Sequence, residues 1–371
     1  MDASRREFFL GAAALGVLAK SGVSPAQQHS VAASEYVPSV QTRRLLSSFG
    51  LTYPIFQGPL GPGIGPALPI AVSNAGAMGG LSLWALPPEE VRTRVEAVRA
   101  ATTKPFAANY VLASEPRSLQ MALDTGAPIV QFSWGMPTKD QVAAVRRAGA
   151  KLGIQVTSRE GARAALEIGV DYLVCQGMEA GGHVQGSWRL LDVLPKVLDE
   201  AKEIPVIAAG GMGNGADIHR ALSAGAAGAL LGTRFVATRE CNAHQQYKEA
   251  LLQADNNQTA LTVCFDGGWP HAPHRVLRNG TFLRWEAAGC PPPGRRPGEG
   301  EVVAVRPNGT EVLRYAAALP TQAFKGTQLL DCALYAGEGV GAVRDIPSAS
   351  ELIHRLWKEC ETAAQSKRRN A

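Results

Sequence analysis

The stretch Ile204-Pro-Val-Ile-Ala-Ala-Gly-Gly-Met-Gly-Asn-Gly215 is an apolar strand that ends in a cluster of glycines. A helical pattern over 216–225 follows, and then a second apolar run, Gly228-Ala-Leu-Leu-Gly-Thr-Arg-Phe235. Two such strands joined by a helix lie parallel, so the strand ends Gly210-Gly211 and Gly232-Thr233 expose backbone N–H groups side by side. In parallel barrels the loops after the last two strands, with a helix N-terminus, commonly bind phosphate. The spacing therefore predicts a ligand that carries a phosphate.

Short apolar runs of the same kind recur upstream, with helical patterns such as 88–98 and 139–147 between them. Continuous apolar runs are typical of parallel strands buried on both faces. Together with the two runs described above, the apolar runs begin near Pro54, Gly80, Phe106, Ile129, Lys151, Tyr172, Pro205 and Gly228. This alternation predicts an α/β fold, a (β/α)8 TIM barrel over residues 45–240. The alternative is a doubly wound open sheet, but its glycine turn could only be 58–65, which prolines interrupt and no helical pattern follows.

A second glycine-rich turn follows the strand Tyr172-Leu-Val-Cys175 and contains Gly177, Gly181, Gly182 and Gly186 around His183. Glycines let a backbone approach a ligand closely, and His183 can exchange a proton near neutral pH. A loop with a solvated histidine is the alternative, which the phosphate signal downstream disfavours. The remaining histidines are expected outside the site: His219 and His354 on helix surfaces, His244 exposed, and His271 and His274 in a loop. No set of ligands has the spacing of a metal site.

Several motifs together resemble the nitronate monooxygenases, formerly called 2-nitropropane dioxygenases. The resemblance runs from about Tyr53 to Phe235 and resumes at 334–339. Its motifs are PIFQGP at 54–59, SNAGAMGGLS at 73–82, the strand end at Asn109, QFSWGMP at 131–137, QGMEAGGH at 176–183, AAGGMG at 208–213, LGTRF at 231–235 and LYAGEG at 334–339. FMN-containing enoyl-acyl carrier protein reductases and some quinone reductases share part of this set.

The resemblance implies FMN across the C-terminal mouth of the barrel. The phosphate is expected on the backbones of Gly210, Gly211, Gly232 and Thr233, with the Thr233 hydroxyl as a further donor. The ring is expected near Gln57, Gly58, Asn109, Gln176 and Gly181, since amide side chains can both donate to and accept from a flavin edge. Alternatively, Asn109 and Gln176 only satisfy buried backbone. By the same resemblance His183 is the candidate general base acting on a carbon acid.

The N-terminal residues look like a twin-arginine export signal over 1–26. Ser4-Arg-Arg-Glu-Phe-Phe-Leu10 precedes a modestly apolar run, 11–19, and then Ser24-Pro-Ala26, a small-residue cleavage site. The apolar run is too short for a stable membrane span. A solvated basic end is the alternative. We expect the twin-arginine translocation machinery as a partner and a periplasmic or exported protein, folded with FMN before export.

Residues 241–330 break the strand–helix rhythm and are expected to form a lobe capping the barrel mouth. The proline-rich loop 290–300 should be exposed, because its prolines remove backbone donors. Lys325 could face the substrate or be solvated. A turn and helix over 331–365, with the helix from Ser348 to Thr362, should close on the barrel.

Cysteine spacing and charge carry little functional information. The six cysteines show no CxxC spacing, so neither a metal site nor a disulfide framework is indicated, although one later pair could bond in an oxidising compartment. Cys175, inside a strand, is expected to be a small core residue. The net charge of +5 is partly terminal and gives no argument for nucleic acid.

Three functions remain open. The first is FMN-dependent oxidation of an alkyl nitronate or nitroalkane by dioxygen to a carbonyl compound and nitrite. The second is NAD(P)H-dependent reduction of enoyl or quinone substrates, and the third is a non-redox role, either on a phosphorylated substrate or as a flavin carrier. Export favours the first, since NAD(P)H and acyl carrier protein are cytoplasmic while dioxygen diffuses freely. No second nucleotide-binding motif is present.

Overall fold

The structure is a computed structural model that describes residues 38–369, so the expected export signal lies outside the described residues. Its main sheet has eight parallel strands in the order β1-β9-β8-β6-β5-β4-β3-β2, and a bridge between Phe56 and Met78 joins its two ends. The strands are β1 (Ile55–Gln57), β2 (Gly79–Ser82), β3 (Phe106–Val111), β4 (Ile129–Ser133), β5 (Lys151–Val156), β6 (Tyr172–Gln176), β8 (Val206–Ala209) and β9 (Gly228–Leu231). All eight expected strands are present. The (β/α)8 barrel is confirmed and the open doubly wound sheet is excluded.

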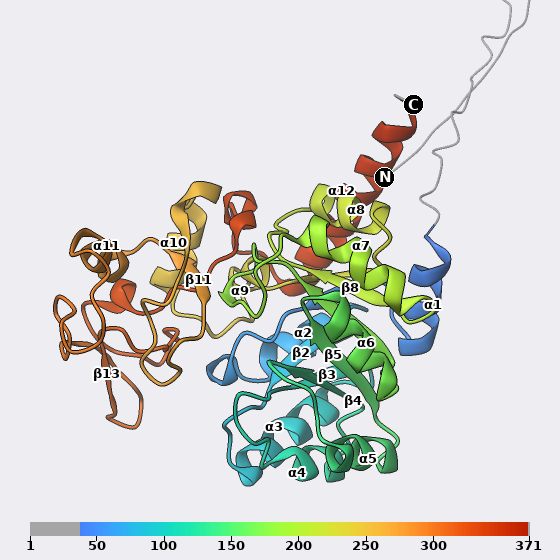
Figure 1. The fold of residues 1–371 in the computed structure, drawn as a ribbon, viewed down its shortest axis with the longest axis horizontal. Coiled ribbons are helices and arrows are strands. Elements are labelled where there is room, and N and C mark those ends of the chain that lie inside the picture. Colours follow the sequence, from blue (N-terminus) through green and yellow to red (C-terminus); the bar gives the residue numbers. More distant parts are fainter. Residues whose placement is uncertain (1–37, 370–371) are drawn as a thin grey trace, which may run out of the picture. The chain divides into compact units, whose positions relative to one another are not determined.

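Helices cover the outside of the barrel, as Figure 1 shows for α3 to α6 beside β2 to β5. Helix α5 begins and ends as expected, and a capping box formed by Thr138 and Gln141 fixes its start. The covering helices are α2 (Ala67–Asn74), α3 (Pro88–Ala101), α4 (Leu119–Asp124), α5 (Lys139–Arg147), α6 (Arg159–Glu167), α7 (Leu190–Ala201), α8 (Gly215–Ser223) and α12 (Ala349–Arg369). The last of these packs against α8 and α2 and runs beyond its expected end at Thr362.

The expectation that no helix follows the glycines at 58–65 was wrong. Helix α2 begins at Ala67, directly after Pro66. Its sequence, ALPIAVSN, is apolar on most sides, and Leu68, Pro69 and Val72 are all buried. A helix of this kind lacks the polar face that makes helical periodicity visible in a sequence.

The barrel interior is filled with side chains from its N-terminal end upward. Helix α1 (Val40–Phe49) contributes Leu45 and Phe49 to an interior cluster with Phe56, Met78, Ile129, Tyr172, Val174 and Ile207. Tyr172 donates a hydrogen bond to Oε1 of Gln131 at 3.0 Å. Gly153 makes room for this ring, because a Cβ atom there would lie 2.1 Å from Cζ of Tyr172. Only the C-terminal mouth of the barrel is left for a ligand.

The segment 241–330 carries its own helices and strands, and one of its strands pairs with a strand end of the barrel. These elements are α10 (Gln245–Gln253), β10 (Thr259–Thr262), β11 (His274–Leu277), α11 (Gly280–Ala287), β12 (Val302–Val305) and β13 (Glu311–Leu313). Strand β11 lies between β10 and β7 (Gly182–His183) and is antiparallel to both. His274 was expected in a loop, and this was wrong: it begins β11 and is fully buried.

Gly153→Ala should destabilise the protein by about 1–3 kcal/mol, the usual cost of overpacking a filled interior, because the Tyr172 ring must move. Gly161→Ala is the matched control. Gly161 lies in α6, where a Cβ meets only ordinary contacts of 3.5 Å or more, and alanine is the better helix former. Thermal or urea unfolding of both variants checks this. A Gly153→Ala protein as stable as the control would show that the interior is loosely packed.

Candidate active site

A cavity of about 250 Å³ opens at the C-terminal ends of the barrel strands. Polar side chains at the ends of successive strands line it: Ser82, Asn109, Ser133, Gln155 and Gln176. The expected glycines Gly58, Gly181, Gly210, Gly211 and Gly232 line it too, together with Thr233 and His183. The structure therefore brings all the expected site residues but Gln57 around one cavity.

The segments expected to bind a phosphate follow β8 and β9. Gly210 and Gly211 have backbone φ angles of +131° and +65°, which residues other than glycine rarely adopt. Helix α9 (Thr233–Val236) begins at the second segment, where the N–H groups of Phe235 and Val236 donate to the Gly232 carbonyl at 2.9 and 3.2 Å. Only the N–H groups ahead of these two, at the start of the turn, are left for a ligand. The Thr233 hydroxyl accepts a hydrogen bond from the Gly337 N–H at 2.9 Å and keeps its own proton to donate. Backbone and hydroxyl donors of this kind fit a phosphate.

The loop at 334–339 depends on another close approach. A Cβ atom at Gly181 would lie 2.5 Å from the Gly337 nitrogen, so only glycine fits where this loop crosses the turn before His183. The two motifs, distant in sequence, form one wall of the cavity.

The three expected amide side chains all bind backbone. Gln57 donates to the Gly58 carbonyl and accepts from the Gly80 N–H at 2.9 Å, and it does not line the cavity. Asn109 lines the cavity and donates to the Gln131 carbonyl at 3.2 Å. Gln176 donates to the His183 carbonyl at 3.2 Å and accepts from the backbone N–H of residue 185 at 3.0 Å. Gln176 thus holds the turn that carries the histidine.

His183 is half-buried, and its Nε2 atom is buried without a hydrogen-bond partner among the described residues. Trp269 stacks on the imidazole, with ring centroids 4.1 Å apart and planes 23° apart. Burial, and then the neighbouring His274, lower the pKa of His183 to about 3. The imidazole is therefore neutral near pH 7, and His183 lines the cavity.

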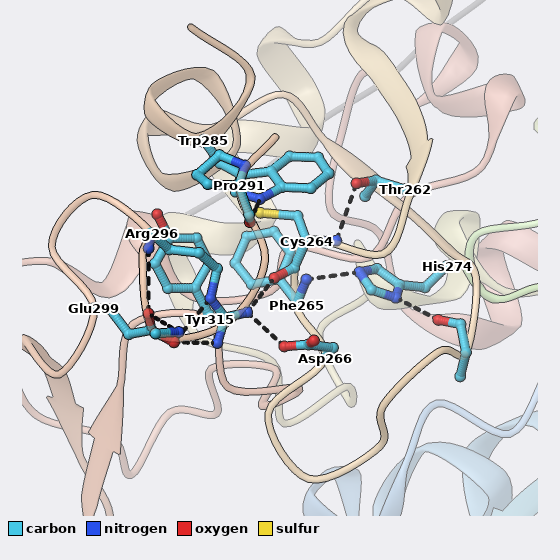
Figure 2. Close-up of polar contacts among 12 residues, drawn as sticks. Thr262, Cys264, Phe265, Asp266, His274, Trp285, Pro291, Arg296, Glu299 and Tyr315 are labelled. Carbon is cyan, nitrogen blue, oxygen red and sulfur yellow. Dashed lines mark hydrogen bonds and ion pairs between the residues drawn. The ribbon is translucent and has the colours of Figure 1, made fainter. Parts of the chain in front are cut away.

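His274 lies 5.3 Å from His183 between ring centroids and was missed as a site neighbour. Both of its nitrogens are bonded to backbone: Nδ1 donates to the Ala272 carbonyl at 2.9 Å and Nε2 accepts from the Phe265 N–H at 3.1 Å (Figure 2). These bonds hold a neutral tautomer, and burial lowers the pKa of His274 as well. It is a structural neighbour of the base and does not compete with it.

Three tryptophans near the mouth of the cavity were also missed. Trp84 follows β2, Trp134 follows β4, and Trp269 comes from the segment before β11. The available signal was that GLSLW and QFSW place a tryptophan one or two residues after a strand end. Trp134 has a φ of +61°, and its backbone N–H donates to Oε1 of Gln185 at 3.1 Å. Lys325 is exposed and does not line the cavity.

The segment that carries Trp269 is held by Arg296 of the proline-rich loop (Figure 2). Arg296 pairs with Asp266 at 2.5 Å and with Glu299 at 2.6 Å, and its guanidinium lies over the Tyr315 ring at 4.4 Å. The loop itself is largely exposed, as expected, but this arginine side chain is only 9% exposed. The proline-rich loop therefore braces one wall of the site.

The residues that the structure describes contain no candidate metal site and no helix that could span a membrane. No group of three or more His, Cys, Asp or Glu side chains there could hold a metal ion. Between residues 38 and 369 no helix combines the length and hydropathy needed to cross a membrane. Cys175 is fully buried in β6, as expected, and its pKa is raised to about 12 by burial.

Comparison with known proteins agrees with this geometry. The family model for nitronate monooxygenase matches residues 43–118 and 111–359. The chain belongs to the nitronate monooxygenase family, whose members are flavin-dependent oxidoreductases.

More particular relatives cover nearly the whole chain. The nitronate monooxygenase of Pseudomonas aeruginosa is 30% identical over 365 residues, which cover 86% of this chain and 99% of that protein. The structure of FabK from Thermotoga maritima is 27% identical with a TM-score of 0.75, covering 88% and 99%. The nitroalkane oxidase structure from Streptomyces ansochromogenes is 28% identical with a TM-score of 0.68, covering 87% and 99%.

Replacing His183 should change how stability depends on pH. The folded-state pKa of about 3 lies below the unfolded value of about 6.5, so between these values the unfolded chain binds more protons and stability falls as pH falls. The burial of neutral His183 then costs up to about 2 kcal/mol at pH 5. His183→Asn should therefore lose less thermal stability between pH 7.5 and pH 5 than the parent. Exposed His354→Asn is the control and should match the parent; identical losses in all three proteins would contradict the buried neutral histidine.

Proposed function

We propose that this protein uses FMN and dioxygen to oxidise alkyl nitronates, and nitroalkanes after deprotonation, to a carbonyl compound and nitrite. One observation carries the proposal: a neutral, half-buried histidine lines the same cavity as the strand ends Gly210-Gly211 and Gly232-Thr233. The named activity of the Pseudomonas aeruginosa relative supports it.

The residues present fit FMN. Gly210, Gly211, Gly232 and Thr233 would hold the phosphate through backbone N–H groups and one hydroxyl. Gly58, Asn109, Gln176 and Gly181 would border the ring, with Gln57 bracing the strand end behind it. Bound FMN supplies the electron acceptor that these side chains lack.

His183 has two tasks in this proposal. In its neutral form it takes the α-proton of a nitroalkane through the unprotonated nitrogen of the ring. In its protonated form it holds the nitronate anion, while the Trp269 ring stacked on it stabilises the imidazolium by a cation–π interaction. The Gln176 amide keeps the His183 backbone in place during both steps.

The principal competing function is NAD(P)H-dependent reduction, which the likeness to the FabK structure favours. The described cavity is lined by no arginine or lysine that could bind a second nucleotide's phosphates. Anaerobic mixing separates the two functions: a nitronate, but neither NADH nor NADPH, should bleach the flavin. Rapid bleaching by a nicotinamide alone would support the reductase.

His183→Asn should leave the protein yellow, because the proposed cofactor contacts come from other residues and the Gln176 bond to the residue 183 carbonyl is kept. The released chromophore should behave as FMN in chromatography. Activity on a neutral nitroalkane should fall by about 10²–10⁴-fold, the usual contribution of a positioned base. With a preformed nitronate the loss should be distinctly smaller, since the proton is already gone. Steady-state oxygen consumption with both forms of one compound makes the comparison.

The outcomes of this experiment are separable. Equal losses with nitroalkane and nitronate would mean that His183 only binds or positions. No loss with either would remove it from the site. A parent protein that is colourless and cannot be reconstituted with FMN would overturn the proposed function itself.

We also propose that the protein is exported by the twin-arginine pathway, on the strength of Arg5-Arg6 before an apolar run. Replacing Arg5 and Arg6 together with lysine keeps the charge but removes both guanidinium groups, which ammonium groups do not imitate. The variant should stay in the cytoplasm, folded and yellow. Cell fractionation that finds it exported like the parent would rule the signal out.

A further inference from the structure

We infer that the cavity selects substrates whose nitro-bearing carbon carries an uncharged, flat, aromatic group. This inference rests on the proposed function and names its substrate class. The evidence is a set of tryptophans that converge near the base, together with the absence of charged side chains from the described lining.

The tryptophans come from three separate segments and meet near His183. Trp269 lies 4.7 Å from Trp134 and 5.7 Å from Trp84 between ring centroids. Trp134 also approaches His183 at 6.1 Å, with the ring planes 81° apart. All three rings are only half-buried although they line the cavity. Indole faces that remain accessible in a cavity favour flat partners at stacking or edge-to-face distances.

The rest of this lining is apolar or uncharged. Leu60, Val236 and Leu319 line the cavity, and its described lining contains no Asp, Glu, Lys or Arg. Arg275, a neighbouring buried cation, donates to the Met178 carbonyl at 2.9 Å and pairs with Glu338 at 3.1 Å. A substrate carboxylate would therefore lose water without gaining a cationic partner, which is costly.

Trp269 stacks on a face of the His183 ring and does not lie in the plane of its nitrogens. A nitrogen lone pair of imidazole lies in the plane of the ring, so a ring stacked on its face does not block proton transfer at the edge. Trp269 covers a face, whereas Trp134 stands nearly perpendicular to the imidazole. A carbon acid that reaches the edge of the imidazole would therefore place its substituent among the indoles.

Binding can be measured without turnover by using nitro compounds that have no α-proton. We choose nitrobenzene, which is flat and neutral, 2-methyl-2-nitropropane, which is neutral but not flat, and 4-nitrobenzoate, which is flat but anionic. Calorimetric titration of the FMN-loaded protein should give nitrobenzene a Kd about 10-fold below those of the other two. The factor corresponds to about one good aromatic contact, or to the lost solvation of a carboxylate.

Variants then locate the effect. Trp134→Ala should weaken nitrobenzene binding about 5- to 10-fold and change 2-methyl-2-nitropropane binding by less than about 2-fold. Trp84→Ala, made on a different loop, should act in the same direction if Trp134→Ala fails to fold. Trp188→Ala is the matched control, because Trp188 is 50% exposed, lies against Lys196 and does not line the cavity. It should bind all three compounds like the parent.

Each result has one meaning. If 4-nitrobenzoate binds as tightly as nitrobenzene, or if both cavity tryptophan variants bind like the parent, the substrate class is overturned. Oxygen consumption with the nitronates of nitroethane and phenylnitromethane tests the proposed function separately: failure to oxidise either overturns that function whatever the binding order. Oxidation of both, with a higher kcat/KM for the aromatic compound, supports the function and the substrate class together.

Discussion

The filled interior of the barrel is the constraint on which the site depends. Alternate strand residues point inward, and an eight-stranded barrel has room only for side chains. Apolar residues and the Tyr172 ring, placed opposite Gly153, fill the lower part, and the hydrogen bond from Tyr172 to Gln131 marks where polar groups begin. Beyond this bond, Asn109, Ser133, Gln155 and Gln176 line an open cavity at the strand ends. Along the same strands, the apolar side chains therefore stabilise the lower part of the barrel, and the polar side chains at the strand ends form the candidate site.

The position of His183 depends on a second contact, the pairing of β7 with β11. Strand β7 has only two residues and depends on its partner strand, in which His274 pairs directly with His183. The segment carrying β11 is fixed in turn by Arg314, whose side chain is fully buried and pairs with Glu301 and Asp331 at 2.7 Å each. The guanidinium is buried although Glu301 is 49% exposed, so removing a carboxylate would leave a buried cation with fewer partners, and the two pairs favour one arrangement. A disturbance in this segment should therefore reach the base, although its chain lies far from the barrel strands in sequence.

The sequence predicted the barrel well and the site unevenly, for reasons that particular residues make clear. Continuous apolar runs identified all eight strands. Gly210-Gly211 and Gly232-Thr233 were predicted at neighbouring strand ends, and they line the cavity. Helix α2 was missed because it has no polar face, and β11 because a four-residue strand beside Pro273 resembles a loop. The tryptophan cluster was invisible because Trp84, Trp134 and Trp269 belong to separate segments and meet only in the folded protein. Bonds from Asn109 and Gln176 to backbone were the alternative that the sequence left open, and both are present, although the fold alone sets their particular partners.

A base with a pKa of about 3 needs help to hold a proton, and the magnitudes indicate where this help comes from. Restoring an ordinary histidine pKa requires about 5 kcal/mol, at about 1.4 kcal/mol per unit. An anion about 4 Å away supplies about 4 kcal/mol at an effective dielectric constant near 20, and a cation–π contact such as that with Trp269 adds about 1 kcal/mol. The anion is therefore the larger contribution and the cation–π contact the smaller one. The low pKa keeps His183 unprotonated before the substrate binds, and the nitronate it produces stabilises the imidazolium. Proton transfer is therefore favourable only while that anion stays beside the ring.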